Sequence, residues 1–225
     1  MTLSNKAARI EQPGAELMEP VMNFLGRYGR IVLGAVVVVI AIGAVWFFAM
    51  RARNTSEEQA ANQLAEANIF YWQGDYARSA QMAKQVYERF GSTESGNDAH
   101  RLAGDAAFWA GDFKTAIAEY RRYLERRKGD LLADAARRSL AYALESDHQF
   151  LEAAPIYEQL VGKFDRTSSA EFLAASSRCY REAGQRDKAI ERLQRLENEF
   201  GDTTYGQMGL IELAELKASQ TPAAH

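Results

Sequence analysis

The chain has 225 residues, of which 47% are hydrophobic and 25% charged, and its formal net charge is −3. This composition is typical of a globular protein and excludes disorder over most of the chain. Residues 51–225 hold 23 Lys and Arg against 27 Asp and Glu. They form no extended basic stripe, which excludes nucleic acid as a partner. Cys179 is the single cysteine, so no internal disulfide is possible and the redox compartment stays open.

Residues 1–30 form an N-terminal tail whose second half is more apolar than its start. Pro20 fits a helix there only in its first turn. Apolar residues recur at spacings of one, three and four, which predicts a short juxtamembrane amphipathic helix. This helix is expected either to rest on lipid headgroups or to dock against a membrane partner. The apolar residues are Leu17, Met18, Val21, Met22 and Leu25.

Residues 31–50, from Ile31 to Met50, read IVLGAVVVVIAIGAVWFFAM and contain no charge, proline, asparagine or glutamine. As a helix this segment is about 30 Å long, the thickness of a bilayer hydrocarbon core. Trp46, Phe47 and Phe48 lie near one end, where interfacial aromatic residues are expected. The segment therefore predicts a single transmembrane helix that remains as an anchor. A buried core helix and a cleaved signal peptide are the alternatives.

The basic residues that flank this segment bear on its orientation. Four of them precede it (Lys6, Arg9, Arg27 and Arg30) and two follow closely (Arg51 and Arg53). Basic residues concentrate on the cytoplasmic side of a membrane. The count therefore predicts a cytoplasmic N-terminus and a translocated C-terminal domain. The immediate flanks are balanced at two against two, which leaves the reverse orientation open.

A repeated unit follows the apolar segment. When Gly74, Gly111, His148 and Gly184 are aligned as equivalent turn residues, the intervals are 37, 37 and 36 residues. Each unit predicts two amphipathic helices joined by a tight turn. An aromatic residue follows three of the turns (Tyr76, Phe113 and Phe150), and Arg186 follows the last. Small residues share two further positions, as close helix approach requires: Ser79, Ala116, Ala153 and Ala189, and Ala67, Gly104, Ala141 and Ser177.

Phe90, Phe164 and Phe200 each stand 16 residues after their turn residue. We expect each of them to mark the end of a second helix. The segment Thr204 to Ala218 is predicted to cap the last exposed core, with its apolar side formed by Leu210, Leu213, Ala214 and Leu216. The predicted repeat region, 51–203, divides at about 57–93, 97–130, 131–167 and 168–203, with a capping helix at 204–218 and a disordered tail at 219–225.

The unit from Asn97 to Asp130 resembles the tetratricopeptide repeat, with Gly104, Gly111-Asp112-Phe113, Ala116, Tyr120 and Tyr123-Leu124 at matching positions. The resemblance departs from the common pattern in its longer period and in the missing terminal proline. It implies an all-α fold, in which the transmembrane helix is followed by an α-solenoid of about four tetratricopeptide-like helix pairs plus a capping helix. The first helices of such a solenoid line a groove.

The architecture as a whole, a short tail, one anchor and about four repeats, is similar to that of the YfgM-like ancillary subunits of the bacterial Sec translocon. This resemblance implies a bacterial inner membrane protein that displays its repeats in the periplasm. It also implies translocon subunits, a membrane-anchored periplasmic chaperone or unfolded clients as partners.

The repeat positions that commonly face the groove define a candidate protein-binding surface. Its aromatic and cationic side chains are of the types that dominate protein interfaces. Packing between adjacent repeats is the alternative role for Trp72 and Trp109. The candidate residues are Asn68, Tyr71, Trp72, Arg101, Asp105, Phe108, Trp109, Arg138, Tyr142, Arg178 and Arg181.

Catalytic, metal and cofactor motifs are missing from the sequence. His100, His148 and His225 lack ligand spacing. There is no P-loop, nucleophile elbow or HExxH motif. Asp75 and Asp112 are explained by turn and capping roles. The cluster Arg121, Arg122, Arg126, Arg127 and Lys128 is expected to be a solvated helix face.

The function predicted from the sequence is that of a non-enzymatic, membrane-anchored protein-interaction module without cofactor, metal or small-molecule substrate, acting in protein export. A structural adaptor for cell-envelope or division-site assembly is the alternative. An enzyme, or a receptor whose repeats face the cytosol, is a third hypothesis.

Overall fold

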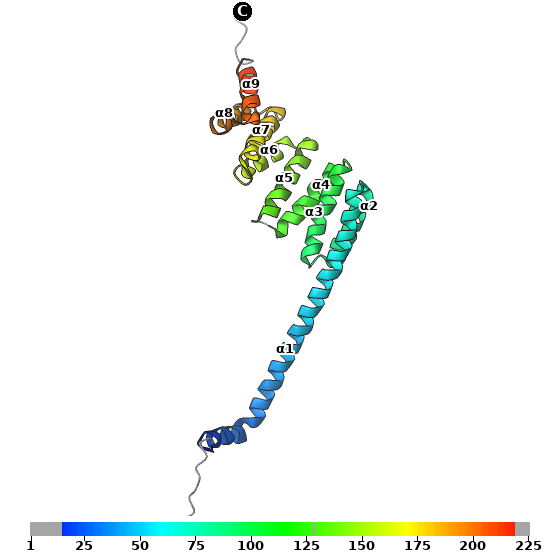
Figure 1. Cartoon of the computed structure of the whole chain (residues 1–225), viewed down its shortest axis with the longest axis vertical. Coiled ribbons are helices and arrows are strands. Elements are labelled where there is room, and N and C mark those ends of the chain that lie inside the picture. The colour runs from blue at the N-terminus through cyan, green and yellow to red at the C-terminus, as the bar shows by residue number, and fades with distance from the viewer. Residues whose placement is uncertain (1–14, 128, 219–225) are drawn as a thin grey trace, which may run out of the picture. The chain divides into compact units, whose positions relative to one another are not determined.

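The computed structural model describes residues 15–127 and 129–218, with residues 15–23 and 25 described by their backbone alone. Over this range the chain is helical and contains no strand. The predicted apolar stripe of the N-terminal tail and the tail 219–225 lie outside what is described. Figure 1 shows the helices in chain order: α1 (Ala15–Trp72), α2 (Tyr76–Phe90), α3 (Glu94–Trp109), α4 (Phe113–Arg126), α5 (Leu131–Ser146), α6 (Phe150–Leu160), α7 (Arg166–Glu182), α8 (Arg186–Phe200) and α9 (Thr204–Ala218).

Helix α1 is 58 residues long and contributes to both compact units of the chain, Met1–Asn54 and Thr55–His225. The segment predicted as a juxtamembrane helix is helical, and it continues without a break from Ala15 through Pro20 into the apolar segment. A proline inside a helix removes one hydrogen bond and can bend the helix without ending it.

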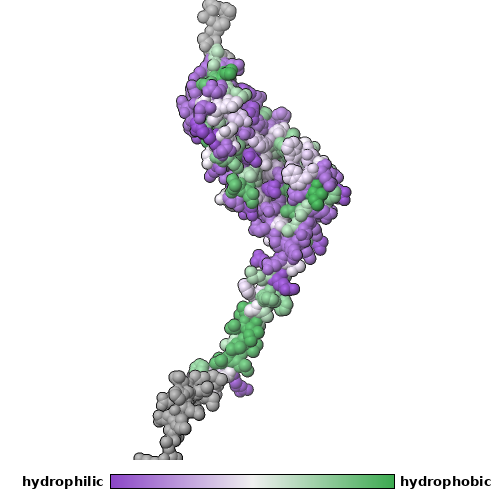
Figure 2. Space-filling view, viewed as in Figure 1, coloured by the Kyte–Doolittle hydropathy of each residue, from purple (hydrophilic) through white to green (hydrophobic). Residues whose placement is uncertain are grey.

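The apolar part of α1 forms a continuous green run in Figure 2. Within Gly26–Trp72, an 18-residue window has a mean hydropathy of 2.9, and none of that window is buried in the protein. By length and composition, α1 is the one helix among the described residues able to cross a membrane.

The turns inside the four helix pairs share one backbone geometry. At the first turn, the N–H of Gly74 donates to the carbonyl of Tyr71 and the N–H of Asp75 donates to that of Phe70, both at 3.0 Å. This is a Schellman motif, in which the residue after the helix adopts a left-handed conformation. The same hydrogen-bond pair recurs at each later turn. The φ angles at the aligned residues are +81° at Gly74, +80° at Gly111, +59° at His148 and +72° at Gly184.

These angles confirm the repeat register, including the position where glycine is replaced. Among the described residues, His148 is the only non-glycine residue with a positive φ. The fold therefore imposes the left-handed turn on a side chain that disfavours it.

The turns between helix pairs are closed by side-chain caps. Thr93 accepts a hydrogen bond from the N–H of Gly96, and Asp165 accepts one from the N–H of Ser168. Helices α2 and α8 end at Phe90 and Phe200, as predicted. The equivalent prediction for Phe164 is wrong, because α6 ends at Leu160 and Gly162 takes a φ of +79°. That left-handed glycine stops the helix one turn early.

Small residues pack the two helices of each pair closely together, as the sequence predicts. Ser79, Ala116, Ala153 and Ala189 are fully buried. In the second pair a Cβ on Gly104 would lie 2.8 Å from Cε1 of Tyr120, so the ring rests directly on the glycine. The counterparts of Gly104 (Ala67, Ala141 and Ser177) are also fully buried.

Helix α9 covers the end of the last pair. Leu213 packs with Leu193 and Leu196 of α8, and a Cβ on Gly209 would lie 2.7 Å from Cδ2 of Leu196. The predicted apolar side is correct for Leu213 and Leu216, whereas Ala214 is exposed. Contact at Gly209 rotates the helix so that its glycines face the core.

Candidate protein-binding groove

The first helices of successive repeats place different side chains at the same position. Three residues before each turn stand Tyr71, Phe108, Glu145 and Arg181 in chain order. The first two positions are aromatic and the last two are charged. The groove therefore has an aromatic part on α1 and α3 and a charged part on α5 and α7.

A cavity of about 310 Å³ opens between α1, α3 and α5, with α4 behind it. We call it the aromatic pocket. Three small residues of α5 (Ala135, Ala136 and Ser139) form one side of it. The other residues that line it are Tyr71, Arg101, Asp105, Phe108, Trp109, Tyr120, Arg138 and Tyr142.

Aromatic rings form the wall of this pocket on α1 and α3. The rings of Phe108 and Trp109 meet edge to face at 5.8 Å, and the ring of Trp109 stacks on that of Tyr76 at 6.4 Å. Trp109 is nevertheless 61% exposed and Trp72 is 81% exposed. Trp72 therefore does not pack between repeats, whereas Trp109 contacts Tyr76 of the preceding repeat and leaves most of its surface exposed. Exposed aromatic surface of this kind marks interaction sites.

The polar centre of the aromatic pocket is Asp105. One carboxylate oxygen accepts a hydrogen bond from the hydroxyl of Tyr120, and the other pairs with Nη1 of Arg101, both at 2.8 Å. Burial raises the pKa of Asp105, and the Arg101 guanidinium offsets only part of this effect. Burial and the nearby Asp105 carboxylate also raise the pKa of Tyr120, so its hydroxyl stays protonated and continues to donate.

Arg138 is the second cation of the pocket, and its electrostatic situation differs from that of Arg101. Its guanidinium carbon lies 5.4 Å from the centre of the Phe164 ring. Over the described part of the chain, Arg138 forms no ion pair. It lowers the pKa of the neighbouring Tyr142 hydroxyl, although burial and Glu171 together raise that pKa to about 12.

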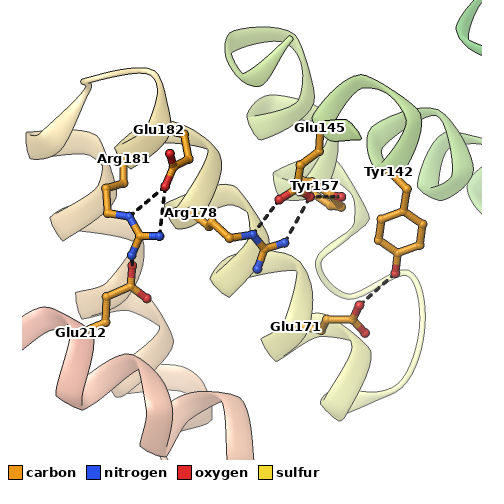
Figure 3. A network of polar contacts seen from close by, with 8 residues as sticks. All are labelled: Tyr142, Glu145, Tyr157, Glu171, Arg178, Arg181, Glu182 and Glu212. Atoms are coloured by element: carbon orange, nitrogen blue, oxygen red, sulfur yellow. Dashed lines mark hydrogen bonds and ion pairs between the residues drawn. The ribbon is translucent and has the colours of Figure 1, made fainter. Parts of the chain in front are cut away.

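The charged part of the groove is drawn in Figure 3. Arg178 of α7 donates to both oxygens of Glu145 of α5, at 2.6 and 3.1 Å. The hydroxyl of Tyr157 donates to the same carboxylate at 2.7 Å. Arg181 pairs with Glu182 of its own helix and with Glu212 of α9. The cations of this part are therefore saturated by carboxylates of the protein itself.

The Tetratricopeptide repeat family models match residues 64–131, 110–168 and 175–203, which together span more than half of the chain. This chain belongs to the tetratricopeptide repeat family. Two solved structures have the same fold: a putative kinesin light chain with TPR-like repeats from Podosopora anserina, and MamA from Desulfovibrio magneticus RS-1. The first is 17% identical with a TM-score of 0.55, covering 72% of this chain and 87% of that chain. The second is 16% identical with a TM-score of 0.53, covering 72% and 96%. A search of curated proteins found no match.

The structure separates the predicted groove residues of these tetratricopeptide repeats into two groups. Seven of them line the aromatic pocket: Tyr71, Arg101, Asp105, Phe108, Trp109, Arg138 and Tyr142. Four do not line it. The amide of Asn68 donates to the carbonyl of Leu64 in its own helix, and Trp72 projects into solvent. Arg178 and Arg181 belong to the saturated charged part.

Sequence reasoning missed several residues of the groove. The pocket is also lined by Tyr120, Ala135, Ala136 and Ser139. Glu145 pairs with Arg178, and Glu171 accepts a hydrogen bond from the hydroxyl of Tyr142. Glu145 occupies the tetratricopeptide position of Tyr71 and Phe108, so the repeat alignment itself contains the signal that identifies it.

Arg121, Arg122 and Arg126 of the basic cluster are exposed, as the prediction of a solvated helix face requires, and the cluster also forms ion pairs. Arg121 pairs with Glu152, Arg122 with Glu119, and Arg127 with Glu94. Arg126 donates to the carbonyl of Gly91. The contacts of Arg121 and Arg126 connect α4 to the neighbouring tetratricopeptide repeats, whereas those of Arg122 and Arg127 stay within one repeat.

Reactive groups are scarce among the described residues. No group of three His, Cys, Asp or Glu side chains there is placed to hold a metal ion. Cys179 is fully buried, and burial raises the pKa of its thiol to about 12, so the thiol stays protonated. The described geometry thus supports recognition of a partner surface by aromatic and charged side chains.

Proposed function

We propose that this protein is a membrane-anchored, non-enzymatic interaction module that binds a protein partner in the aromatic pocket. Tetratricopeptide repeats are protein-interaction modules, and the observation that carries the proposal is the pocket itself. Trp109 remains exposed and Tyr71, Phe108 and Tyr142 are only half-buried, although the fold buries aromatic residues elsewhere, such as Tyr123 and Phe172. Exposed tryptophan and tyrosine beside arginine is the composition of an energetic hot spot.

The anchor in this proposal is the segment from Ile31 to Met50. Its side chains are uncharged and almost all exposed along α1. Exposure of this apolar surface to water is unfavourable, whereas its burial in hydrocarbon is favourable. A helix also forms its backbone hydrogen bonds internally, as the hydrocarbon region requires. Because α1 continues to Trp72, the same helix carries the first residues of the groove.

The location in this proposal is the bacterial inner membrane, with the N-terminus in the cytoplasm and the repeats in the periplasm. The count of flanking basic residues and the resemblance to YfgM-like translocon subunits support it. The partners are then a translocon component, a periplasmic chaperone or an unfolded client during protein export. No substrate chemistry is required for this role.

Site-specific photo-crosslinking in cells tests partner binding. A photoreactive amino acid replaces Trp109 in the pocket, and in a control it replaces Leu151 of α6, which is 57% exposed. We expect crosslinks to envelope or export proteins from position 109 and far fewer from position 151. Equal crosslinking from both positions, or recovery of cytosolic proteins alone, would refute the proposal.

Protease accessibility of a C-terminal tag tests the location. We expect the tag to be protected in intact cells and digested in spheroplasts. Protection in spheroplasts would place the repeats in the cytosol and leave the receptor hypothesis as the better one.

A structural adaptor is the second candidate, because α9 leaves Met208 and Ile211 62% and 64% exposed. An exposed apolar helix face favours association with a folded partner or a second copy. Sedimentation of the full chain in detergent and of a Met208→Ser, Ile211→Ser variant tests it. Self-association that the variant abolishes would support the adaptor.

A further inference from the structure

We propose that the aromatic pocket selects a partner segment in which an aromatic side chain is next to a carboxylate side chain. The ring enters the pocket against Phe108 and Trp109, and the carboxylate binds Arg138. This inference rests on the proposed function, because it names the chemistry of the segment that the same pocket binds.

The size of the pocket selects one large side chain. At about 310 Å³ it lies at the lower end of the range for small-molecule pockets, roughly 300–1,000 Å³. Its α5 side carries only Ala135, Ala136 and Ser139 between the longer side chains, which leaves room for a ring. The opposite side offers the rings of Tyr71, Phe108 and Trp109, and aromatic pairs gain energy beyond their buried area.

The charge of the pocket selects an acidic neighbour. Both oxygens of Asp105 already accept a hydrogen bond, from Tyr120 and Arg101, and the Arg101 guanidinium already balances the carboxylate charge, so a ligand cation gains less there. Arg138 contacts an aromatic ring but no carboxylate in the described part of the chain. A ligand carboxylate at Arg138 would form a charge-assisted, bidentate pair without breaking an existing ion pair.

The other arginines of the groove explain why an acidic side chain of the partner binds at Arg138. Arg178 and Arg181 already hold Glu145, Glu182 and Glu212, and a ligand would have to compete with these carboxylates. Arg138 is therefore the cation of the predicted groove set that is available to a partner. Aromatic anchor and carboxylate must lie close together in the partner, because Arg138 and Trp109 line the same cavity.

Peptide binding to the full-length protein in detergent micelles tests the inference. The probes are short glycine-serine peptides, blocked at both ends, with a central Trp-Glu, Trp-Gln, Trp-Lys or Ala-Glu pair. Blocking removes the terminal carboxylate, so an unblocked Trp-Gln peptide separately tests whether a chain terminus can replace the acidic side chain. Fluorescence anisotropy of a labelled peptide measures Kd.

We expect the Trp-Glu peptide to bind best and Arg138→Gln to weaken it about tenfold, the effect of losing one charge-assisted contact. The Trp-Gln peptide should bind the wild type about tenfold more weakly and be insensitive to Arg138→Gln, because each change removes the same pair. Arg138→Lys should fall between the two. Arg121→Gln removes the same charge from a residue outside the groove, which is paired with Glu152, and should leave Kd unchanged. The melting temperature of each variant checks that it folds.

The inference is overturned if Trp-Gln or Trp-Lys binds as tightly as Trp-Glu, if Arg138→Gln leaves Kd unchanged, or if Trp-Glu does not bind. It is also overturned if the unblocked Trp-Gln peptide binds as tightly as the blocked Trp-Glu peptide, because a chain terminus would then replace the acidic side chain. Any of these results leaves the proposed function standing as long as crosslinks form from position 109 in cells. Loss of those crosslinks would refute the proposed function itself.

Discussion

The aromatic and charged parts of the groove occupy equivalent positions of one repeated fold, yet they differ in what they leave for a partner. In the aromatic part, Tyr71 and Phe108 stand three residues before their turns and border an open cavity. In the charged part, Glu145 and Arg181 hold those places and are engaged in ion pairs (Figure 3). The comparison shows that the repeat determines where a side chain points, while its chemistry decides whether the site is open or already filled.

The packing behind the aromatic pocket offers the largest expected effect. Gly104→Leu places a side chain where the ring of Tyr120 lies, 2.8 Å from the position of a Cβ. We expect the free energy of unfolding to fall by about 2 to 3 kcal/mol, because overpacking displaces a buried ring. Urea denaturation measures it. Gly129→Leu is the control, because a Cβ on Gly129 has no atom within 4 Å, and a fall of similar size there would contradict a packing effect.

The next largest effects are expected at two buried tyrosines, one in the aromatic part of the groove and one in the charged part. Tyr120→Phe leaves Asp105 with Arg101 as its remaining partner, and we expect a loss of about 2 kcal/mol in unfolding free energy. Tyr157→Phe leaves Glu145 with two donors from Arg178, so the loss should be about 1 kcal/mol. Equal losses in chemical denaturation would contradict the idea that the charged part is better saturated.

Opposite substitutions at the turn residues His148 and Gly111 test the strain of the left-handed turn. Both have a positive φ, of +59° and +80°. Gly111→Ala should lower the free energy of unfolding by about 1 kcal/mol, and His148→Gly should raise it by a similar amount, because L residues are strained there. Thermal melting of both variants measures the difference. Destabilisation by His148→Gly would mean that the His148 side chain contributes more than its strain costs.

The pH dependence of stability tests the electrostatics of Asp105. Its pKa is raised in the folded protein, so the folded state binds more protons than the unfolded state between the ordinary carboxyl value and the raised one. Stability from this group is therefore present at low pH and falls as pH rises through the raised value. We expect Asp105→Asn to gain stability relative to the wild type from low pH to neutral pH in urea titrations. A relative loss of stability over that window would show that folding lowers the pKa of Asp105.

The smallest effect is expected at an exposed ion pair of the charged part. The Arg178 side chain is 47% exposed, so Arg178→Gln should cost only about 0.5 kcal/mol despite its two hydrogen bonds to Glu145. The loss should shrink in high salt, because ions screen exposed charges. A salt-independent loss of several times this size would indicate that the charged part is a structural core element.

Much of the fold was predictable from local pattern. The alignment of Gly74, Gly111, His148 and Gly184 predicted four tight turns, and the structure gives each a left-handed conformation, even where histidine replaces glycine. The capping roles of Asp75 and Asp112 followed from their place after the turn, and both accept a hydrogen bond from an N–H three residues on. The end of α6 was not predictable in this way, because the repeat alignment pointed to Phe164 while Gly162 broke the helix locally.

Within the candidate groove, the sequence by itself determined the repeat, its period and the first-helix positions, because turn chemistry and helical periodicity are local properties of the chain. It also determined the uncharged segment from Ile31 to Met50. Only the tertiary structure decided which predicted groove residues share a cavity and which cations are already paired. Arg101, Arg138, Arg178 and Arg181 look alike in sequence. Asp105 meets Arg101 within one helix, whereas Glu145 and Glu212 reach Arg178 and Arg181 only after neighbouring helices pack. Pairing between helices depends on distances that no local pattern contains, and for that reason the availability of Arg138 emerged from the fold.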